Sequence, residues 1–269
     1  MNKYFRLGKK LFPICRSITG NGVRKTLTII RDYLPKLKII EVKSGTKAFD
    51  WKIPPEWNIK EAYVKDKYGK KIINFKKNNL HLVGYSIPVK KVITKKEFFS
   101  HLHTLKLQPN AIPYITSYYK KYWGFCISDN EKQKLKKGKY KVLINSKFSR
   151  GKMNYGEYFI KAKSKKEIFF STYICHPSMA NNELSGLCVT TYIAKWIEDL
   201  KKRRFTYRII FVPETIGSIT YLSKNLDVMK KNIICGFNVS CVGDDRAYSF
   251  IPSRNGKTIS DFVGRHVLK

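Results

Sequence analysis

The second half of the chain alternates between two patterns of apolar positions. Residues 167–174, 207–213 and 232–243 are runs of apolar, aromatic and β-branched residues, as is typical of buried strands. Residues 185–202 and 218–225 lie between them, and their apolar side chains recur at helical spacing. This strand–helix–strand–helix–strand succession predicts a parallel sheet with right-handed crossovers.

The first half of the chain shows a different pattern, with helical spacing at its start and short strand-like runs after it. Residues 23–34 have helical spacing up to Pro35, and residues 1–12 show a weaker helical pattern. From Phe49 onward, short aromatic and β-branched runs are separated by prolines and by turns such as Asp66-Lys67-Tyr68-Gly69. We therefore predict an α/β domain formed by residues 1–48 and 161–269, with a β-rich domain inserted at residues 49–160.

Polar side chains follow each of the three predicted parallel strands. The carboxyl ends of parallel strands meet at one edge of a sheet, where ligands bind in open α/β folds. Imidazole and carboxylates converging there suit a divalent metal, and the histidine favours zinc. We predict Glu214 as the general base that activates water. The predicted metal ligands are His176, Glu183 and Asp244, and the predicted substrate contacts are Asn182, Asp245 and Arg246.

Each of these residues also has a purely structural interpretation. His176 precedes Pro177 and could bond to backbone at a strand end. Asn182 and Glu183 could cap the next helix, and Glu214 could be a solvated turn residue. Residues 244–246 could form a local ion pair, which contributes little at a surface. Five aromatic residues could line a sugar or peptide site or could pack in the core, namely Trp51, Trp57, Tyr118, Tyr119 and Trp123. The histidines at positions 81, 101 and 103 are not expected to be metal ligands.

Composition adds a strong positive charge to this picture. The 269 residues include 54 Lys and Arg against 19 Asp and Glu, a formal net charge of +35. This charge suits a polyanion partner, but the lysines are spread over the whole length, as a biased codon usage would also produce. No zinc-finger, RRM or KH motif favours nucleic acid. The six cysteines are scattered without a C-x-x-C pair, which is typical of reduced core thiols.

The lengths of the apolar runs indicate in which cell compartment the protein is expected. No apolar run is long enough for a membrane span. The N-terminus lacks the continuous apolar core of a signal peptide. We therefore expect a cytoplasmic protein, and a homo-oligomer is an open alternative.

Several long strings resemble bacterial aminopeptidase-like proteins found in surface-polysaccharide biosynthesis loci. These strings are ICRSITGNGVRKTL, WKIPPEWNIKEAYV, LHLVGYSIPV, YGEYF, CHPSMANNELSG, PETIG and CVGDDRAYSFIPSRNGKTISD. The resemblance covers nearly the whole chain. It implies a zinc-exopeptidase-like three-layer α/β sandwich with a mixed, largely parallel sheet, interrupted by a small β-rich domain. It also implies a C-terminal winged-helix domain beyond residue 269, so the chain is expected to be incomplete at that end.

The resemblance also assigns roles within the site. His176 matches the first zinc ligand of such aminopeptidases, and Glu214 matches the general base. Asn182 stands where these enzymes have a bridging Asp, Thr215 where they have a second Glu, and Ser240 where they have a strand Asp. In this comparison Asp244 is a substitute ligand, and His266, on a predicted helix at residues 259–268, is a poor replacement for their late histidine.

These patterns together predict a metal-dependent, aminopeptidase-like hydrolase. Its substrate would be a small peptide or an amidated sugar, cleaved at an N-terminal peptide bond or an N-acyl group. The cofactor would be one or two zinc ions, or none if the site has decayed. The alternatives are a catalytically inactive binding or scaffold protein with the same fold, and a basic nucleic-acid-binding protein.

Overall fold

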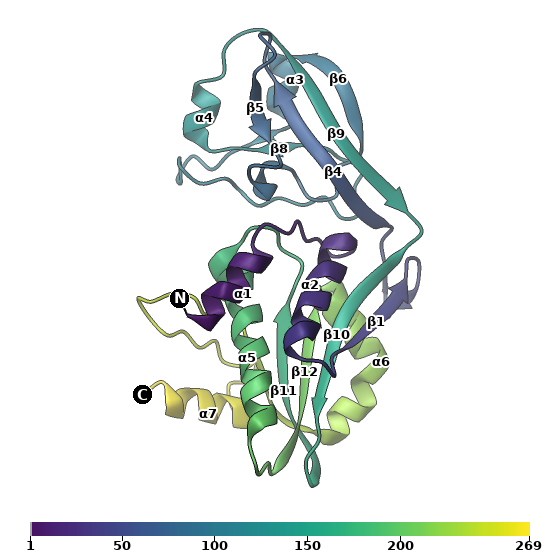
Figure 1. Ribbon diagram of the computed structural model, residues 1–269, viewed down its shortest axis with the longest axis vertical. Coiled ribbons are helices and arrows are strands. Elements are labelled where there is room, and N and C mark those ends of the chain that lie inside the picture. The colour runs from purple at the N-terminus through teal and green to yellow at the C-terminus, as the bar shows by residue number, and fades with distance from the viewer. Residues whose placement is uncertain (1) are drawn as a thin grey trace. The chain divides into compact units, whose positions relative to one another are not determined.

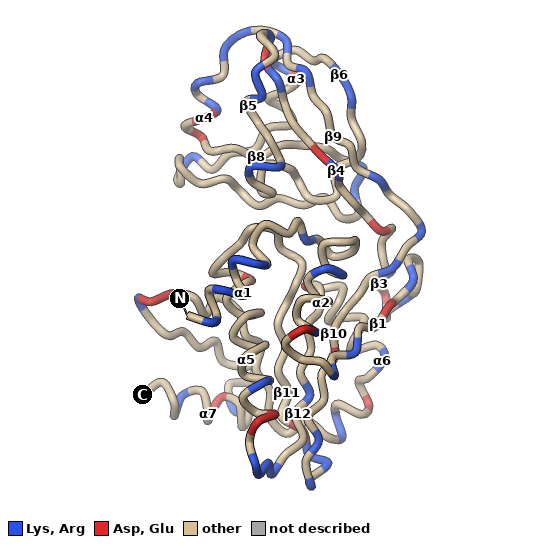
Figure 2. The backbone as a smooth tube through the Cα atoms, in the orientation of Figure 1, with Lys and Arg blue, Asp and Glu red and all other residues tan. Residues whose placement is uncertain are grey.

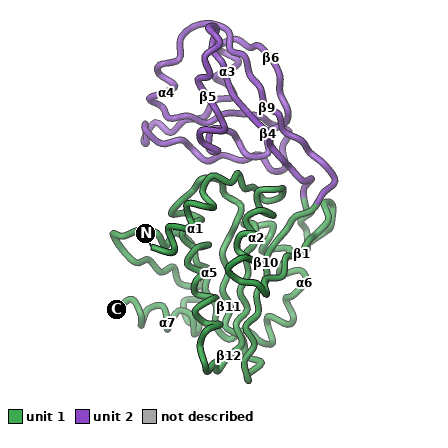
Figure 3. Tube along the Cα trace, in the orientation of Figure 1, with its two compact units in different colours: residues 1–53, 152–269 green, residues 54–151 purple. Residues whose placement is uncertain are grey.

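The computed structural model describes residues 2–269 and divides the chain into two compact units. Unit 1 combines residues 1–53 with 152–269, and unit 2 is residues 54–151 (Figure 3). The boundaries expected from sequence lay at residues 48/49 and 160/161. The difference comes from strand β10 (Lys152–Ile160), which pairs within the sheet of unit 1.

Unit 1 is built on a five-stranded mixed sheet in the order β1-β10-β12-β11-β13 (Figure 1). The central strand β12 (Phe205–Val212) runs parallel to β11 (Ser164–Tyr173), which in turn runs parallel to β13 (Ile233–Asn238). These are the three strands predicted to be parallel, and that prediction is confirmed. β10 and β1 (Lys38–Lys43) add to the other edge in antiparallel fashion.

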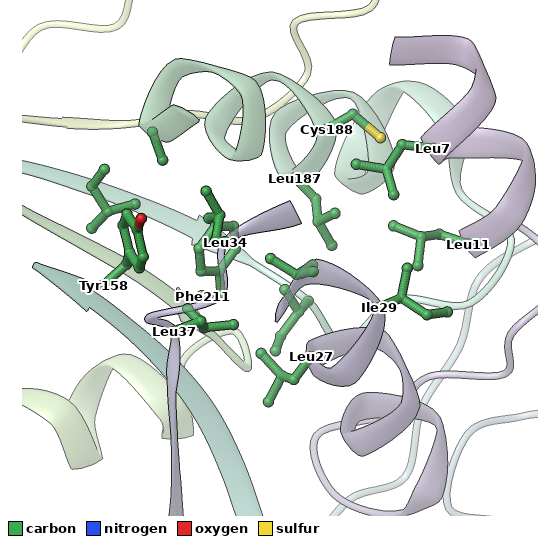
Figure 4. Close-up of a cluster of buried hydrophobic side chains, with 14 of the residues drawn as sticks. Leu7, Leu11, Leu27, Ile29, Leu34, Leu37, Tyr158, Leu187, Cys188 and Phe211 are labelled. Atoms are coloured by element: carbon green, nitrogen blue, oxygen red, sulfur yellow. The ribbon is translucent and has the colours of Figure 1, made fainter. Parts of the chain in front are cut away.

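One face of this sheet is covered by three helices, α1 (Lys3–Leu11), α2 (Asn21–Tyr33) and α5 (Ser185–Asp199). Their apolar faces enclose a buried cluster together with sheet residues such as Tyr158 and Phe211 (Figure 4). Burial of such side chains contributes about 1.5–3 kcal/mol each to folding. This cluster therefore fixes α5, and with it the loop that precedes α5, against the end of β11.

The opposite face is covered by α6 (Ile216–Asn232), which follows β12 directly. Its Tyr221 packs edge-on against Tyr155 of β10 and bonds to Arg208 of β12. The expected helix at residues 218–225 is therefore present and longer than its apolar pattern indicated. The helix expected at residues 259–268 is α7 (Ile259–Val267), which packs against β13.

Strand β13 is shorter than the run at residues 232–243 indicated. The chain leaves the sheet after Asn238 and turns, with Cys241 at a left-handed φ of 54°. The turn brings residues 239–243 back over the start of α5. Gly186 permits this approach, because a Cβ there would lie 2.2 Å from the carbonyl oxygen of Val239.

Unit 2 contains an antiparallel four-stranded sheet in the order β5-β4-β9-β6. Its strands are β4 (Glu56–Lys65), β5 (Lys71–Asn74), β6 (Val89–Thr94) and β9 (Lys139–Ser149). The predicted hairpin turn joins β4 to β5, where Asp66 accepts from the amides of Tyr68 and Lys70. The smaller elements are η1 (Asn79–His81), α3 (Lys95–Ser100), β7 (Leu102–His103), β8 (Phe125–Cys126) and α4 (Asp129–Gln133), and in unit 1 the hairpin β2 (Lys47–Ala48) and β3 (Trp51–Lys52).

The aromatic and histidine side chains of unit 2 mostly serve its interior. Trp57 and Trp123 are buried, whereas Tyr119 is exposed. Nδ1 of His81 lies 2.8 Å from the carbonyl oxygen of Cys126, and His101 stacks on Trp123. The interpretation as core packing therefore describes both buried tryptophans.

Candidate functional site

His176 lies where β11 ends, at the edge predicted to carry the site. Its side chain is 6% exposed. Ring atom Nδ1 lies 2.8 Å from Oδ1 of Asn182, and Nε2 lies 2.9 Å from Oε2 of Glu214. Asn182 belongs to η2 (Ala180–Leu184), a π-helical turn that leads into α5. Two of the residues predicted for this site, Asn182 and Glu214, are therefore in contact with the His176 ring.

Glu214 lies on the turn between β12 and α6, and its position is fixed by the backbone. Its amide donates to the Sγ atom of Cys175 at 3.2 Å. The next residue, Thr215, has φ 58° and ψ −82°, a conformation that costs energy for any residue with a side chain. The Glu214 side chain remains 51% exposed. The turn thus presents a half-exposed carboxylate to a nearly buried imidazole.

The hydrogen bonds of His176 constrain where its protons lie. With the Asn182 amide oriented so that Oδ1 faces the ring, that oxygen can only accept, so Nδ1 carries a proton and donates it. Nε2 of a neutral ring then directs a lone pair at the Glu214 carboxylate. Two lone pairs at this distance repel unless a positive centre lies between them. A separation of 2.9 Å suits a direct hydrogen bond and leaves no room for a zinc ion on the line between the two atoms, because zinc binds nitrogen and oxygen at about 2 Å.

A buried ion pair holds the loop between β11 and α5 in place. Nε of Arg16 lies 2.8 Å from Oε1 of Glu183, and both side chains are fully buried. The other oxygen of Glu183 accepts the backbone amide of His176. Burial raises the pKa of Glu183, while the charge of Arg16 and contacts with His176 act in the opposite direction. Both Glu183 oxygens are therefore committed within the protein.

Arg16 reaches Glu183 from the connection between α1 and α2. Its Nη1 also donates to the carbonyl of Leu11 at 2.7 Å. The connection is tight, since a Cβ at Gly22 would lie 1.8 Å from the carbonyl oxygen of Cys15. Arg16 is thus a site residue that the sequence patterns did not single out. The string ICRSITGNG contained it, but nothing in that string indicated a partner 167 positions away.

The third predicted loop contributes different residues from those expected. Asp244 bonds to Arg246, with Oδ1 2.9 Å from Nε and Oδ2 2.6 Å from Nη2, and Asp245 and Arg246 are exposed. The interpretation as a local ion pair describes this contact. Residues before Asp244 approach the site instead: the amide of Cys241 donates to the carbonyl of Asn182 at 3.3 Å.

The donor set can be tested against the zinc that the predicted site implies. Within residues 2–269, one group of at least three His, Cys, Asp or Glu converges, namely Cys175, His176 and Glu214, with ligand atoms within 4.8 Å of one another. Burial raises the pKa of the Cys175 thiol well above its usual range. Glu183 and Asp244 are occupied by arginines. His176 and Glu214 are therefore the described donors that would hold a single cation, and the described residues do not fit a two-zinc centre.

The fold and this site can now be compared with known proteins. A family model described as Domain of unknown function (DUF4910) matches residues 5–269. The chain belongs to this family. A curated protein of Clostridium acetobutylicum, whose name refers to polysaccharide biosynthesis and an aminopeptidase-like domain, is 49% identical over 264 residues. The match covers 98% of this chain and 60% of that protein.

Solved structures agree with this assignment. A crystal structure from Clostridium acetobutylicum, described as that of a peptidase, has a TM-score of 0.95 at 49% identity and covers 99% of this chain and 62% of its own. The chain thus spans about three fifths of these relatives. A zinc aminopeptidase of Bacillus subtilis has a TM-score of 0.64 at 13% identity, with 95% of this chain and 72% of that chain covered.

These comparisons confirm two predictions made from the sequence, the resemblance to aminopeptidase-like polysaccharide biosynthesis proteins and the zinc-exopeptidase-like α/β fold. At 13% identity the zinc enzyme shows the fold alone. Among residues 2–269, no helix combines the length and apolarity that crossing a membrane requires.

Proposed function

We propose that this chain is an aminopeptidase-like amide hydrolase that acts in the biosynthesis of a polysaccharide. Its substrate would be an N-terminal peptide bond or an N-acyl group on a sugar. The observation that carries the proposal is the 2.9 Å approach of His176 Nε2 to the half-exposed Glu214 carboxylate at the carboxyl end of the parallel strands. The name of the 49% identical relative supports the link to polysaccharides.

In this proposal Glu214 is the general base. Its exposed carboxylate can accept a proton from a water molecule that attacks the amide carbonyl. The His176 ring is oriented by Asn182 and lies beside the Glu214 carboxylate. Arg16 and Glu183 hold the amide of His176, and thus the loop, in place. His176 and one oxygen of Glu214 would hold a single zinc ion, which would supply Lewis acidity to the amide carbonyl, and the other Glu214 oxygen would remain the base.

A second candidate is a binding protein with the same fold and no hydrolytic activity. One observation favours it: Asn182, Thr215 and Ser240 offer no carboxylate at three positions where the resemblance leads one to expect acidic residues. Such a protein would still recognise a small amide through His176 and Glu214.

The two candidates are separated by a hydrolysis assay on protein purified without chelator. We would measure release from aminoacyl p-nitroanilides and from N-acetylated amino sugars, and the zinc content of the same samples by mass spectrometry. The proposal expects hydrolysis of at least one amide class and a zinc content of at most one ion per chain. The variant His176→Ala should lose the hydrolytic activity and the bound zinc. If the wild-type protein hydrolyses none of these amides, with or without added zinc, the binding protein is favoured and the hydrolase is excluded.

A further inference from the structure

The solvent-facing side of the four-stranded sheet in unit 2 carries lysines that lie directly beside one another. In the strand register, Lys65 of β4 is opposite Lys141 of β9, and Lys71 of β5 pairs with Lys65 across an irregularity in the β4–β5 register. Directly opposed side chains on a sheet have Cβ atoms about 4.5–5.5 Å apart, and like charges in this position are destabilising. The three lysines thus form a row of positive charge across three strands.

This charge is not neutralised within the protein. Among residues 2–269, no ion pair includes Lys65, Lys71 or Lys141. Lys139 and Lys147 are also exposed on alternate positions of β9, and one acidic residue, Glu61 of β4, lies on the same face opposite Asn145. Figure 2 shows Lys and Arg positions, in blue, along the strands and turns of unit 2. The sheet thus keeps a repulsive arrangement that a bound polyanion would relieve.

Lys141, at one end of the row, lines a groove, and the ring of Tyr63, which also lines it, contacts the other two lysines. The groove has a volume of about 720 Å³ and is open to solvent, and its lining includes Tyr63, Lys90, Lys141, Leu143 and Asn145. The ammonium groups of Lys65 and Lys71 lie 5.5 Å and 4.5 Å from the centroid of the Tyr63 ring. Cation–π contacts of this kind hold the two charges in place. Less side-chain entropy is therefore lost when an anion binds.

We propose that this groove binds an acidic polysaccharide, a polymer whose carboxylate groups pair with the lysine row. The choice of a polysaccharide rests on the proposed function. The chemistry of the face also favours it over nucleic acid. Single-stranded nucleic acid is usually bound by stacking successive bases on several aromatic rings, whereas Tyr63 is the one aromatic residue among those that line the groove. Lysine provides compact point charges that suit spaced carboxylates.

The test compares two triple variants of the full chain that carry the same change in charge. The face variant is Lys65→Gln/Lys71→Gln/Lys141→Gln. The control variant is Lys106→Gln/Lys120→Gln/Lys121→Gln, whose lysines are exposed in the same unit but lie outside the four strands. Binding to polygalacturonate, to neutral dextran and to a single-stranded oligonucleotide is measured at 50 mM and 200 mM NaCl.

The proposal expects the wild-type protein and the control variant to bind polygalacturonate at low salt, with affinities within about threefold of each other, and expects binding to weaken at high salt. The face variant should bind about tenfold more weakly and should melt no lower than the wild type, because a repulsion has been removed. Dextran should not bind. Equal losses in both triple variants, tighter binding of the oligonucleotide, or no binding of polygalacturonate would each overturn the proposal.

The same samples keep the two proposals apart. The face variant should hydrolyse a small amide at the wild-type rate, because none of its changes lies in unit 1. If the wild-type protein binds polygalacturonate at the lysine row but hydrolyses no amide, the hydrolase fails and the binding surface stands.

Discussion

Each face of the sheet in unit 1 buries an arginine–glutamate pair. The contacts of one pair stay inside the protein, whereas those of the other lead to an exposed carboxylate. On the α6 face, Arg208 bonds to Glu167 through Nε at 2.5 Å and Nη2 at 3.1 Å, and its Nη1 reaches the hydroxyl of Tyr221 at 2.8 Å. Tyr221 in turn donates to Glu157. Every group in this network finds its partner inside the protein.

On the α5 face, the chain of contacts that starts at Arg16 leads outward. It passes through Glu183 to the amide of His176, and from the His176 ring to Glu214, which is 51% exposed. Nη2 of Arg16 is buried and has no hydrogen-bond partner within residues 2–269. Buried polar groups are nearly always satisfied. The comparison therefore leads us to expect that the Arg208 pair serves stability, and that the Arg16 pair supports the proposed site.

The largest effect on stability is expected from Arg208→Met. The change leaves the carboxylates of Glu167 and Glu157 buried without their cation, and breaking a buried ion pair costs about 3–5 kcal/mol. Urea unfolding should show the loss as a lower midpoint. The rate of amide hydrolysis per folded molecule should stay at the wild-type value, because Arg208 has no contact with the site. A reduced rate in the folded fraction would contradict the separation of the two networks.

A smaller loss of stability, about 2–4 kcal/mol, is expected from Arg16→Met, because one carboxylate is stranded rather than two. This variant should also lose activity, since Glu183 no longer holds the amide of His176 in place. We expect kcat to fall at least about tenfold, with little change in KM, when the assay is run well below the melting temperature. The control is Arg208→Met at the same fraction folded. Equal activity in the two variants would show that Arg16 serves the fold alone.

The smallest effect concerns thiol chemistry and leaves the fold unchanged. Burial raises the pKa of Cys15, Cys126 and Cys188 to about 12, and that of Cys175 well above 9, so little thiolate is present in these residues at pH 8. Cys241 is exposed, and its Sγ lies 3.8 Å from Nδ2 of Asn182. Iodoacetamide at pH 8 should therefore modify Cys241 first, as peptide mass mapping can show. The variant Cys241→Ser should lack the fast phase; fast labelling of a buried cysteine would contradict this.

The sequence predicted the parts of the fold that depend on local pattern. Strands β11, β12 and β13 and the helices between them follow from apolar spacing. The meeting of His176 with Glu214 follows from the rule that parallel strands end at one edge. Strand pattern does not reveal the partner of a strand, and for this reason residues 152–160 were placed in the inserted domain although β10 pairs with β1 and β12.

Residues that depend on distant partners were harder to predict. Arg16 and Glu183 are 167 positions apart, and neither shows its partner in the surrounding sequence. Asp244 was assigned to the metal because β13 was expected to run to residue 243. The strand ends at Asn238, and the carboxylate of Asp244 is taken by Arg246 two positions later. Local pairing of this kind removes a carboxylate from a site without any change in the apolar pattern.

The rate of amide hydrolysis in Glu214→Gln decides whether the contact between His176 and Glu214 is a reactive site. The glutamine keeps the size of the side chain and removes its basicity. Because this side chain is half exposed, the melting temperature should stay within about 2 °C of the wild-type value. If Glu214 is the base, kcat should fall about 10²–10⁴-fold on any amide that the wild-type protein cleaves. An unchanged rate in this variant would contradict that role.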